Sequence, residues 1–193
     1  MADEWWTLPR AGEELGKDRI STRDLARAGC LGPTIEAGRR TLVRAEHVRE
    51  LAKLPRVEPP HPAALVLRIG LAKELRPGED PAWPERRWLG YRSDLAPTER
   101  ADALRGWWRV ENPERWVGGL LVVTLRGLVV EVYEVTGVES AWQQLRRFTV
   151  VAPTADSRAD AFRGRWLPTG PGGLTVALDA DSHRPPDAGG RAH

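Results

Sequence analysis

The sequence predicts an α+β protein built from two units. Amphipathic helical patterns punctuated by glycine fill the first quarter of the chain, a proline-rich segment follows, and short strand-like runs dominate the rest. Strands that are grouped, rather than alternating with helices, favour this class over a doubly wound parallel sheet. We place a first unit at residues 1–57, a linker at 58–63, a second unit at 64–179 and a disordered tail at 180–193.

Composition narrows the classes of protein to consider. The chain has 193 residues, of which 41% are hydrophobic and 29% charged, as in ordinary globular proteins. Its single cysteine, Cys30, excludes an internal disulfide and a multi-cysteine zinc site. No apolar run approaches the ~20 residues of a membrane span, and the N-terminus MADEWWTLPR lacks the pattern of a secretory signal. We therefore expect a cytoplasmic protein with no membrane partner.

Two helices are predicted at the start of the first unit. Thr7 is placed to cap the first helix, and Gly16 lies just past its end. Ser21 is placed to cap a second helix over residues 22–28, which Gly29 ends. In this second helix Arg23 and Arg27 are four residues apart, so they share one face.

A hairpin and a third helix complete the first unit. Apolar alternation around the Ala37-Gly38 pair predicts a tight hairpin with Arg39 and Arg40 at its tip. Residues 45–54 then return as a helix. Between positions 17 and 56 there are ten basic residues and five acidic ones. Such an excess on a small helical unit is typical of nucleic-acid binding.

The linker is predicted from the prolines of LPRVEPPHPAA, because proline fixes φ and removes a backbone donor. The second unit is expected to be a small, partly open β-barrel with flanking helices. Strands are predicted at residues 63–70, 120–125, 128–136, 146–151 and 174–178, and helical segments at 98–106 and 112–116. Residues 71–95 are expected to form a long loop.

Tryptophan is concentrated before the central hairpin of the second unit. Trp107, Trp108 and Trp116 lie within ten positions, in a chain with nine tryptophans but two Phe and two Tyr. Large flat rings can stack on a base, although they can equally fill a small core. Neighbouring side chains point in different directions, so we expect one of the adjacent pair to be structural and the other, Trp108, to face a pocket.

The segments EWWTLPRAGEELG, ISTRDLARAG, GRRTLV and AEHVRELA together resemble the winged helix-turn-helix of the excisionase and MerR-like group. The resemblance implies a recognition helix in the major groove and a wing on the backbone or minor groove. The residues it implies are Ser21, Thr22, Arg23 and Arg27 on the helix, and Arg39, Arg40 and Arg44 on the wing. Asp24 departs from this picture unless it accepts a capping hydrogen bond from Ser21. A winged helix used for protein contacts is the alternative.

The segments RGWWRV, PERW, LLVVTLRGLVVEVYEVTG and RRFTVV resemble the PUA-like superfamily, which includes the EVE, ASCH and YTH barrels. That resemblance implies a pocket that binds RNA or a base flipped out of a duplex. The pocket residues it implies are Trp88, Tyr91, Arg105, Trp107, Trp108, Trp116 and Tyr133. Arg105 is equally explained as a solvated arginine at a helix end.

Enzyme signatures are missing from the sequence. The four histidines, His47, His61, His183 and His193, have no metal-ligand spacing, and no P-loop, dinucleotide fingerprint or nucleophile elbow is present. Glu131, Glu134 and Glu139 have a spacing that could serve acid–base work, but exposed alternation on a strand explains at least Glu131. We therefore expect no enzyme, cofactor or metal site.

The leading hypothesis is a two-module protein that binds double-stranded DNA. The winged helix would dock on the duplex, and the tryptophan-rich barrel would read a modified or extruded base. One alternative is a transcription regulator whose barrel binds a small effector or mediates dimerisation. Another is an RNA-binding protein in which the barrel dominates.

Overall fold

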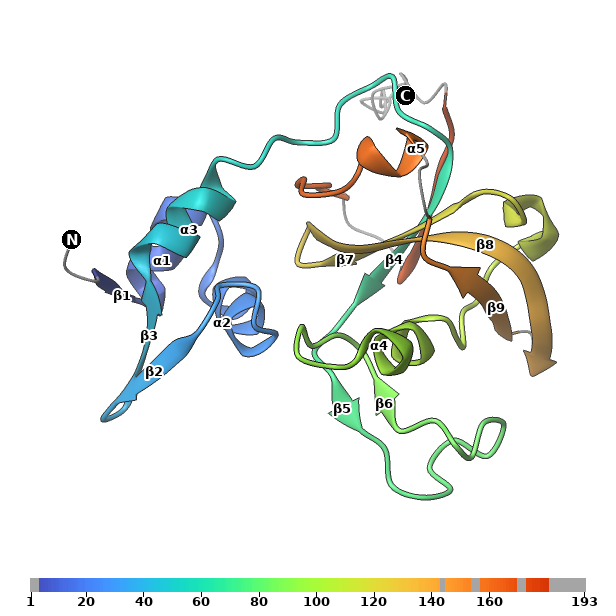
Figure 1. Cartoon of the computed structure of the whole chain (residues 1–193), viewed down its shortest axis with the longest axis horizontal. Helices are drawn as coiled ribbons and strands as arrows, with labels where there is room; N and C mark the ends of the chain where they lie inside the picture. The colour runs from blue at the N-terminus through green and yellow to red at the C-terminus, as the bar shows by residue number, and fades with distance from the viewer. Residues whose placement is uncertain (1–3, 143–144, 154–156, 170–172, 181–193) are drawn as a thin grey trace, which may run out of the picture.

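The structure, a computed structural model, describes residues 4–142, 145–153, 157–169 and 173–180. Within these residues the chain is α+β, and two units lie side by side, joined by an extended segment (Figure 1). Of the predicted tail, residues 181–193 lie outside the described part of the chain. Among the described residues, no helix is both long and apolar enough to cross a membrane.

The first unit follows the predicted order of helix, helix, hairpin and helix. Its elements are β1 (Trp5–Thr7), α1 (Leu8–Leu15), α2 (Arg19–Arg27), β2 (Thr34–Ala37), β3 (Arg40–Arg44) and α3 (Ala45–Ala52). Strand β3 lies between β1 and β2 in a small antiparallel sheet. Strand β1 was not predicted, because a strand of three residues with a partner almost forty positions away leaves no local pattern.

The start of α2 differs from the prediction. Asp18, not Ser21, is the N-cap: its carboxylate accepts hydrogen bonds from the backbone N–H of Ile20 at 2.8 Å and of Ser21 at 2.9 Å. Ser21 lies inside the helix, and its hydroxyl donates to Asp18 at 2.7 Å. Both residue types are good N-caps, so sequence alone did not distinguish them. Asp24 therefore does not have the capping role for Ser21 that the sequence left open.

The ends of the helices and the β2–β3 hairpin, which is the predicted wing, agree with the glycine pattern. Gly16 follows α1 with φ of 60°, and Gly29 lies past α2 with φ of 78°, the left-handed region that favours glycine. Thr7 occupies the N-cap position of α1, but its hydroxyl makes no capping hydrogen bond. In the wing Ala37 pairs with Arg40, so Gly38 and Arg39 form a two-residue turn.

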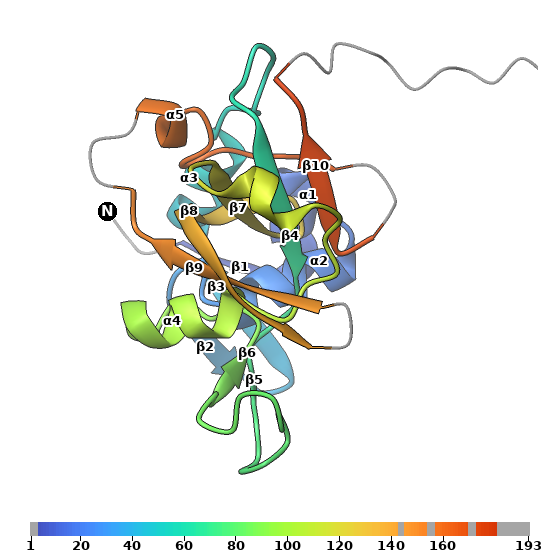
Figure 2. The same cartoon turned by 90° about the vertical axis from the view of Figure 1, so that its right-hand side faces the viewer.

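The second unit is built on an open five-stranded sheet rather than a partly open barrel, and none of the described sheets closes into a barrel. Its strands are β4 (Ala64–Ile69), β7 (Leu120–Leu125), β8 (Leu128–Trp142), β9 (Leu145–Val151) and β10 (Thr175–Leu178), in the order β10-β4-β7-β8-β9. Strands β4 and β7 are parallel, and the other neighbours are antiparallel. With β10 and β9 at opposite edges (Figure 2), the described sheet has no closing pair.

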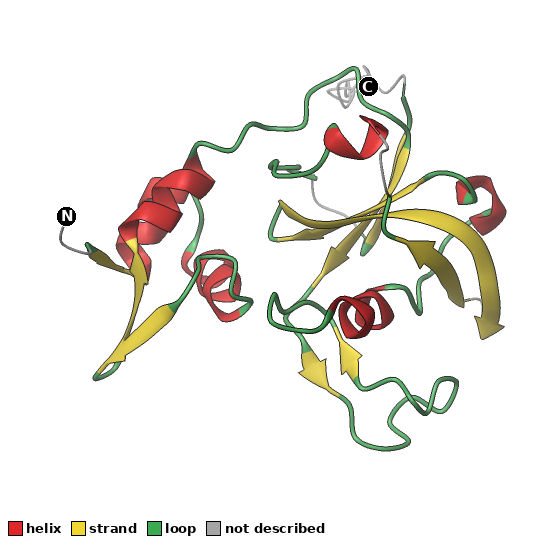
Figure 3. Ribbon diagram, in the orientation of Figure 1, coloured by secondary structure: helices red, strands yellow, loops and turns green. Residues whose placement is uncertain are grey.

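Alternate residues of β4 and β7 supply two apolar layers, one on each face of the sheet. Ala64, Val66 and Val122 pack with Phe162, which follows the short helix α5 (Ser157–Asp160). Their neighbours on the opposite face pack beneath α4 (Pro97–Leu104). In Figure 3 the two helices lie on opposite sides of the sheet. Burial on both faces explains the continuous apolar character of ALVL and LLVVTL.

The crossover from β4 to β7 holds the long predicted loop. It contains a small hairpin of β5 (Lys73–Glu74) and β6 (Trp88–Leu89), then α4 and the 3₁₀ turn η1 (Pro113–Trp116). Strands of two residues are too short to produce a period, which is why the hairpin was not predicted. The helical predictions for α4 and η1 are confirmed.

The two units contact each other directly. The indole N–H of Trp166 donates to the Leu51 carbonyl at 2.9 Å, and the Trp166 backbone exchanges hydrogen bonds with residues 55 and 57 of the connecting segment. At the end of α2 the Ser93 N–H donates to the Ala28 carbonyl at 2.9 Å. These contacts fix the orientation of α2 relative to the sheet of the second unit.

Candidate nucleic-acid interface

Three arginines form a stripe along α2. Arg19, Arg23 and Arg27 recur every four residues, and all three side chains are exposed. Ile20 lies beside them with 54% of its surface exposed, whereas Leu25 on the inner face is completely buried. A helix has 3.6 residues per turn, so residues four apart stay on one face. The outer face of α2 is thus cationic, with one apolar side chain.

The wing adds two arginines opposite this stripe. Arg39 lies in the turn and Arg40 begins β3. Together with Arg19 and Arg23 they line a groove of about 630 Å³, which residues 7–9 at the junction of β1 and α1 also line. Four guanidinium groups therefore surround one groove between the helix and the hairpin.

Within the described part of the chain, these guanidinium groups have almost no partners. Arg19, Arg27, Arg39 and Arg40 make no side-chain hydrogen bond, ion pair or ring contact with the described residues, and Arg23 only approaches Asp24 at 3.8 Å. A cluster of like charges without counter-charges raises the local potential and attracts an anion. Arginine also offers the planar bidentate donor that suits phosphate and guanine edges.

Other arginines of the same unit behave differently. Arg49 binds the Glu4 carboxylate at 2.5 Å, and Arg10 binds it at 3.4 Å. Both guanidinium groups also lie over the ring of Trp6, at 4.7 and 4.4 Å from its centre. These arginines hold β1 against α1 and α3, so charge on this unit is divided between a structural set and an outward-facing set.

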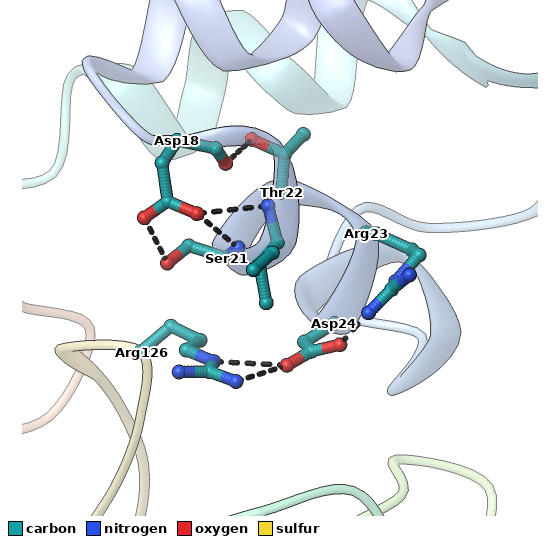
Figure 4. Close-up of polar contacts among 7 residues, drawn as sticks. Asp18, Ser21, Thr22, Arg23, Asp24 and Arg126 are labelled. Atoms are coloured by element: carbon teal, nitrogen blue, oxygen red, sulfur yellow. Dashed lines mark hydrogen bonds and ion pairs between the residues drawn. The ribbon is translucent and has the colours of Figure 1, made fainter.

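The inner edge of α2 is bound to the second unit. Asp24, with a side chain only 9% exposed, accepts hydrogen bonds from Arg126 at 2.5 and 2.9 Å (Figure 4). Arg126 lies in the turn between β7 and β8.

The N-cap of α2 is also held by a side-chain contact. The hydrogen bond from the Ser21 hydroxyl is the main reason why the pKa of Asp18 lies below its ordinary value. The N-cap and the ion pair fix the position of α2 from its inner side and leave the arginine stripe outward.

The predicted nucleic-acid residues divide into two groups. Arg23, Arg39 and Arg40 are exposed and line the groove, whereas Arg27 is exposed but lines a separate hollow shared with residues 92–94 of the second unit. Ser21 and Thr22 are 9% and 0% exposed, and the Thr22 hydroxyl donates to the Asp18 carbonyl at 2.9 Å, so the expected place in a major groove does not fit them.

Arg44 is also away from the groove. It ends β3 at the opposite end from the wing turn, and its guanidinium lies 5.4 Å from the Trp5 ring. The missed residue is Arg19. Its spacing of four from Arg23 was visible in the sequence, but the wrong N-cap placed Arg19 outside the helix.

The predicted base-pocket residues are largely core residues. Trp108, Trp116, Tyr91 and Tyr133 are between 4% and 8% exposed and belong to one apolar cluster. Trp108 donates its indole N–H to the Leu104 carbonyl at 2.8 Å, so it is the structural member of the pair, contrary to expectation. Tyr133 also lines a hollow of about 250 Å³.

The other predicted pocket residues are half-buried and engaged. Trp107 donates to the Asp80 carboxylate at 3.2 Å. Trp88 has the guanidinium groups of two neighbouring arginines over its ring, at 5.2 and 5.7 Å. Arg105 forms ion pairs with Asp102 at 2.9 Å and Glu139 at 2.5 Å, so it is not a solvated helix-end arginine.

An unpredicted tryptophan organises this region. Trp83 is 3% exposed, and three guanidinium groups surround its ring, those of Arg86, Arg105 and Arg147 at 5.3, 4.7 and 4.4 Å. Arg86 is itself buried, with an ion pair to Asp80 at 3.5 Å. No local pattern favoured Trp83 over the other tryptophans, since it lay in the expected loop.

Carboxylates of the central strand are also engaged in structural contacts. Glu131 is partly buried, not exposed, and pairs with Arg100 at 2.5 Å. Burial raises its pKa, and Arg100 opposes that rise. Within the described residues no group of three or more His, Cys, Asp and Glu side chains could hold a metal ion.

Comparisons with protein families, curated proteins and solved structures found no match to this chain.

Proposed function

We propose that this protein binds double-stranded DNA through its first unit, which acts as a winged helix-turn-helix. Helix α2 would enter the major groove with Arg19, Arg23 and Arg27 outward, and the β2–β3 turn would place Arg39 and Arg40 on the adjacent backbone. The observation that carries the proposal is the set of exposed arginines around one groove, which find almost no counter-charge among the described residues.

The shape of the surface also supports this proposal. A helix and a hairpin of the first unit border the same groove, so one ligand could contact both. The exposed Ile20 adds an apolar side chain that could contact a thymine methyl group. Arg126 engages Asp24 beside the stripe, and Arg19, Arg23 and Arg27 all remain exposed, so the second unit leaves the arginine stripe accessible.

The test is a salt titration of duplex binding by fluorescence anisotropy. Wild-type protein should bind a labelled duplex with an affinity that falls steeply with salt, by ~0.9 in the log–log slope per neutralised phosphate. Replacing Arg19, Arg23, Arg39 and Arg40 together by alanine should weaken binding about a thousandfold, from ~1 kcal/mol per contact. Arg109→Ala is the matched control, because Arg109 is exposed in the second unit with no side-chain partner among the described residues.

Two outcomes would overturn the proposal. One is wild-type affinity in the four-arginine variant, and the other is an equal loss in Arg109→Ala, which would indicate a general charge effect. Duplex RNA and single-stranded RNA serve as competitors. Preference for either one over duplex DNA would favour the RNA-binding alternative, since the narrow major groove of A-form RNA excludes a helix.

The reading of a modified or extruded base by the second unit stays a prediction. Its proposed rings are buried or stacked on arginines in the structure. A base would have to displace these contacts before it could stack, which adds to the few kcal/mol needed to unstack it. Competition between modified and unmodified duplexes measures this directly.

A further inference from the structure

A second cationic hollow lies between the two units. Its volume is about 350 Å³, within the range of small-molecule sites. The first unit contributes Lys17, which precedes α2, and Ser21 from its first turn. The second unit contributes Arg68 from β4, Thr124 from β7 and Arg126 from the β7–β8 turn. This hollow is separate from the groove at the wing, because the two share no lining residue.

The lining of the hollow carries positive charge only. Lysine and arginine supply three cations, and no acidic residue lines it among the described residues. Asp18 and Asp24, which contact two of the lining residues, are both engaged: Asp18 accepts from Ser21, and Asp24 accepts from Arg126. Charge of one sign in a partly enclosed hollow favours an anion over a neutral ligand.

Lys17 is the most distinctive member of this set. Its ammonium group lies 4.4 Å from the centre of the Trp166 ring and forms no ion pair with the described residues. Burial lowers its pKa, and the charge of nearby Arg56 lowers it further. The nearby Asp18 carboxylate opposes this lowering without reversing it, so the ammonium group remains destabilised beside Arg56, and a bound anion would relieve that repulsion.

We propose that this hollow binds a small phosphate-bearing anion. Lys17, Arg68 and Arg126 would surround the phosphate, whereas the buried Thr124 hydroxyl donates to the Leu67 carbonyl at 3.2 Å and only lines the hollow. Arginine donates to phosphate in a bidentate manner, and lysine adds a mobile point charge. Several cations converging from both units would clamp one dianionic group.

Binding would act on α2, a consequence that rests on the proposed DNA-binding function. Arg126 holds Asp24 on the inner edge of α2 (Figure 4), and the anion would compete for the same guanidinium. Weakening this ion pair would release one of the contacts that fix α2 against the second unit. The ligand would therefore change DNA affinity without touching the arginine groove.

The three lysines of this chain provide a direct test. In protein labelled with ¹⁵N-lysine, the backbone amides of Lys17, Lys53 and Lys73 are the only lysine signals. Titration with inorganic pyrophosphate at constant ionic strength should shift the Lys17 signal in a saturable manner. Lys53 and Lys73 should not shift; Lys73 is an internal control because it is ion-paired with Glu79. Sodium chloride at equal ionic strength controls for screening.

A single substitution tests whether Lys17 supplies one of the cations that bind the anion. Lys17→Gln should keep the circular dichroism spectrum of the wild type and weaken pyrophosphate binding roughly tenfold or more by calorimetry. Arg109→Ala should leave it unchanged. If Lys17→Gln fails to fold, the wild-type protein is acetylated with and without pyrophosphate. Bound pyrophosphate should protect Lys17, because the acetylating reagent needs a free amine.

The outcomes separate this proposal from the DNA-binding one. Equal shifts at all three lysines, no shift at Lys17, or unchanged affinity in a folded Lys17→Gln variant would overturn the anion site. A saturable Lys17 shift in a protein that binds no duplex would sustain the site and refute only the proposed function. If the protein binds both duplex DNA and pyrophosphate, pyrophosphate should change the duplex affinity of the wild type but not that of Lys17→Gln. Absence of this difference would overturn the proposed effect of the anion on DNA binding.

Discussion

Packed arginines of the second unit and the arginines on the outer surface of the first unit differ in what their guanidinium groups contact. In the second unit Arg86, Arg100 and Arg105 each pair with a carboxylate, and their side chains are at most 20% exposed. On the outer face of α2 and on the wing, Arg19, Arg27, Arg39 and Arg40 are exposed and engage no side chain of the described residues. The same residue type thus serves packing in one region and remains available for a ligand in the other.

The physical difference is desolvation. A guanidinium that is already buried has lost its water and needs its carboxylate, so removing either partner leaves an uncompensated charge. An exposed arginine keeps its water and can exchange it for a phosphate at little cost to folding. Composition alone counts both kinds together, which is why the basic excess of the first unit was only a weak indication of a binding surface.

The largest difference in stability should come from Arg86→Ala. The side chain of Arg86 is 3% exposed, pairs with Asp80 and donates to the Ala103 carbonyl at 2.8 Å. Its removal would leave the Asp80 carboxylate, 11% exposed, without its cation and with only the Trp107 indole as a side-chain partner, and should cost about 3–5 kcal/mol in denaturant unfolding. The four-arginine variant of the groove should unfold within about 0.5 kcal/mol of the wild type. Equal stability of the two variants would erase the distinction between packed and available arginines.

The ion pair between the units should respond asymmetrically. Arg126→Gln removes both hydrogen bonds to the buried Asp24 carboxylate, leaves only Arg23 nearby at 3.8 Å, and should cost about 1–3 kcal/mol. Asp24→Asn leaves Arg126, 42% exposed, to return to water, so it should cost less. Unfolding of the two single variants and of the double variant gives the coupling energy. A larger cost for Asp24→Asn would show that the burial of Asp24 does not control this contact.

The wing pair should have a smaller and purely ionic effect. Arg39→Ala with Arg40→Ala should weaken all duplex sequences alike, by ~1 kcal/mol per arginine, and reduce the salt slope by ~1 for each phosphate that is no longer neutralised. Stability should not change, because neither guanidinium contacts another side chain among the described residues. Weaker binding to one sequence alone, at an unchanged slope, would assign these arginines to base reading.

The smallest effect should be at the helix cap. Asp18→Ala removes the acceptor for two backbone N–H groups of α2 and should lower the melting temperature by a few degrees. The pKa of Asp18 is lowered in the folded protein, so its stabilisation is complete above the unfolded pKa and disappears as pH falls through the folded pKa. Melting curves of both proteins should converge in acid. A constant difference at every pH would mean that the carboxylate is not the cap.

Much of the fold was accessible from local signals. Glycine positions and apolar spacing predicted α1, the wing and α3, because these elements depend on neighbours a few residues away. The same signals failed for β1, β5 and α5. These elements are four residues or shorter, and contacts with segments distant in the sequence stabilise them. The open sheet was also not predicted, since strand order depends on pairing between segments as far apart as β4 and β7.

Sequence by itself determined where charge and aromatic rings are concentrated, since composition and spacing are properties of the chain alone. Only the tertiary structure decided which of them are available. It buried Thr22 and Trp108 and left Arg19 exposed. It also brought Lys17 and Arg126 to one hollow across more than a hundred positions. Burial and counter-charge are set by neighbours from other elements, and these neighbours exist only once the chain has folded.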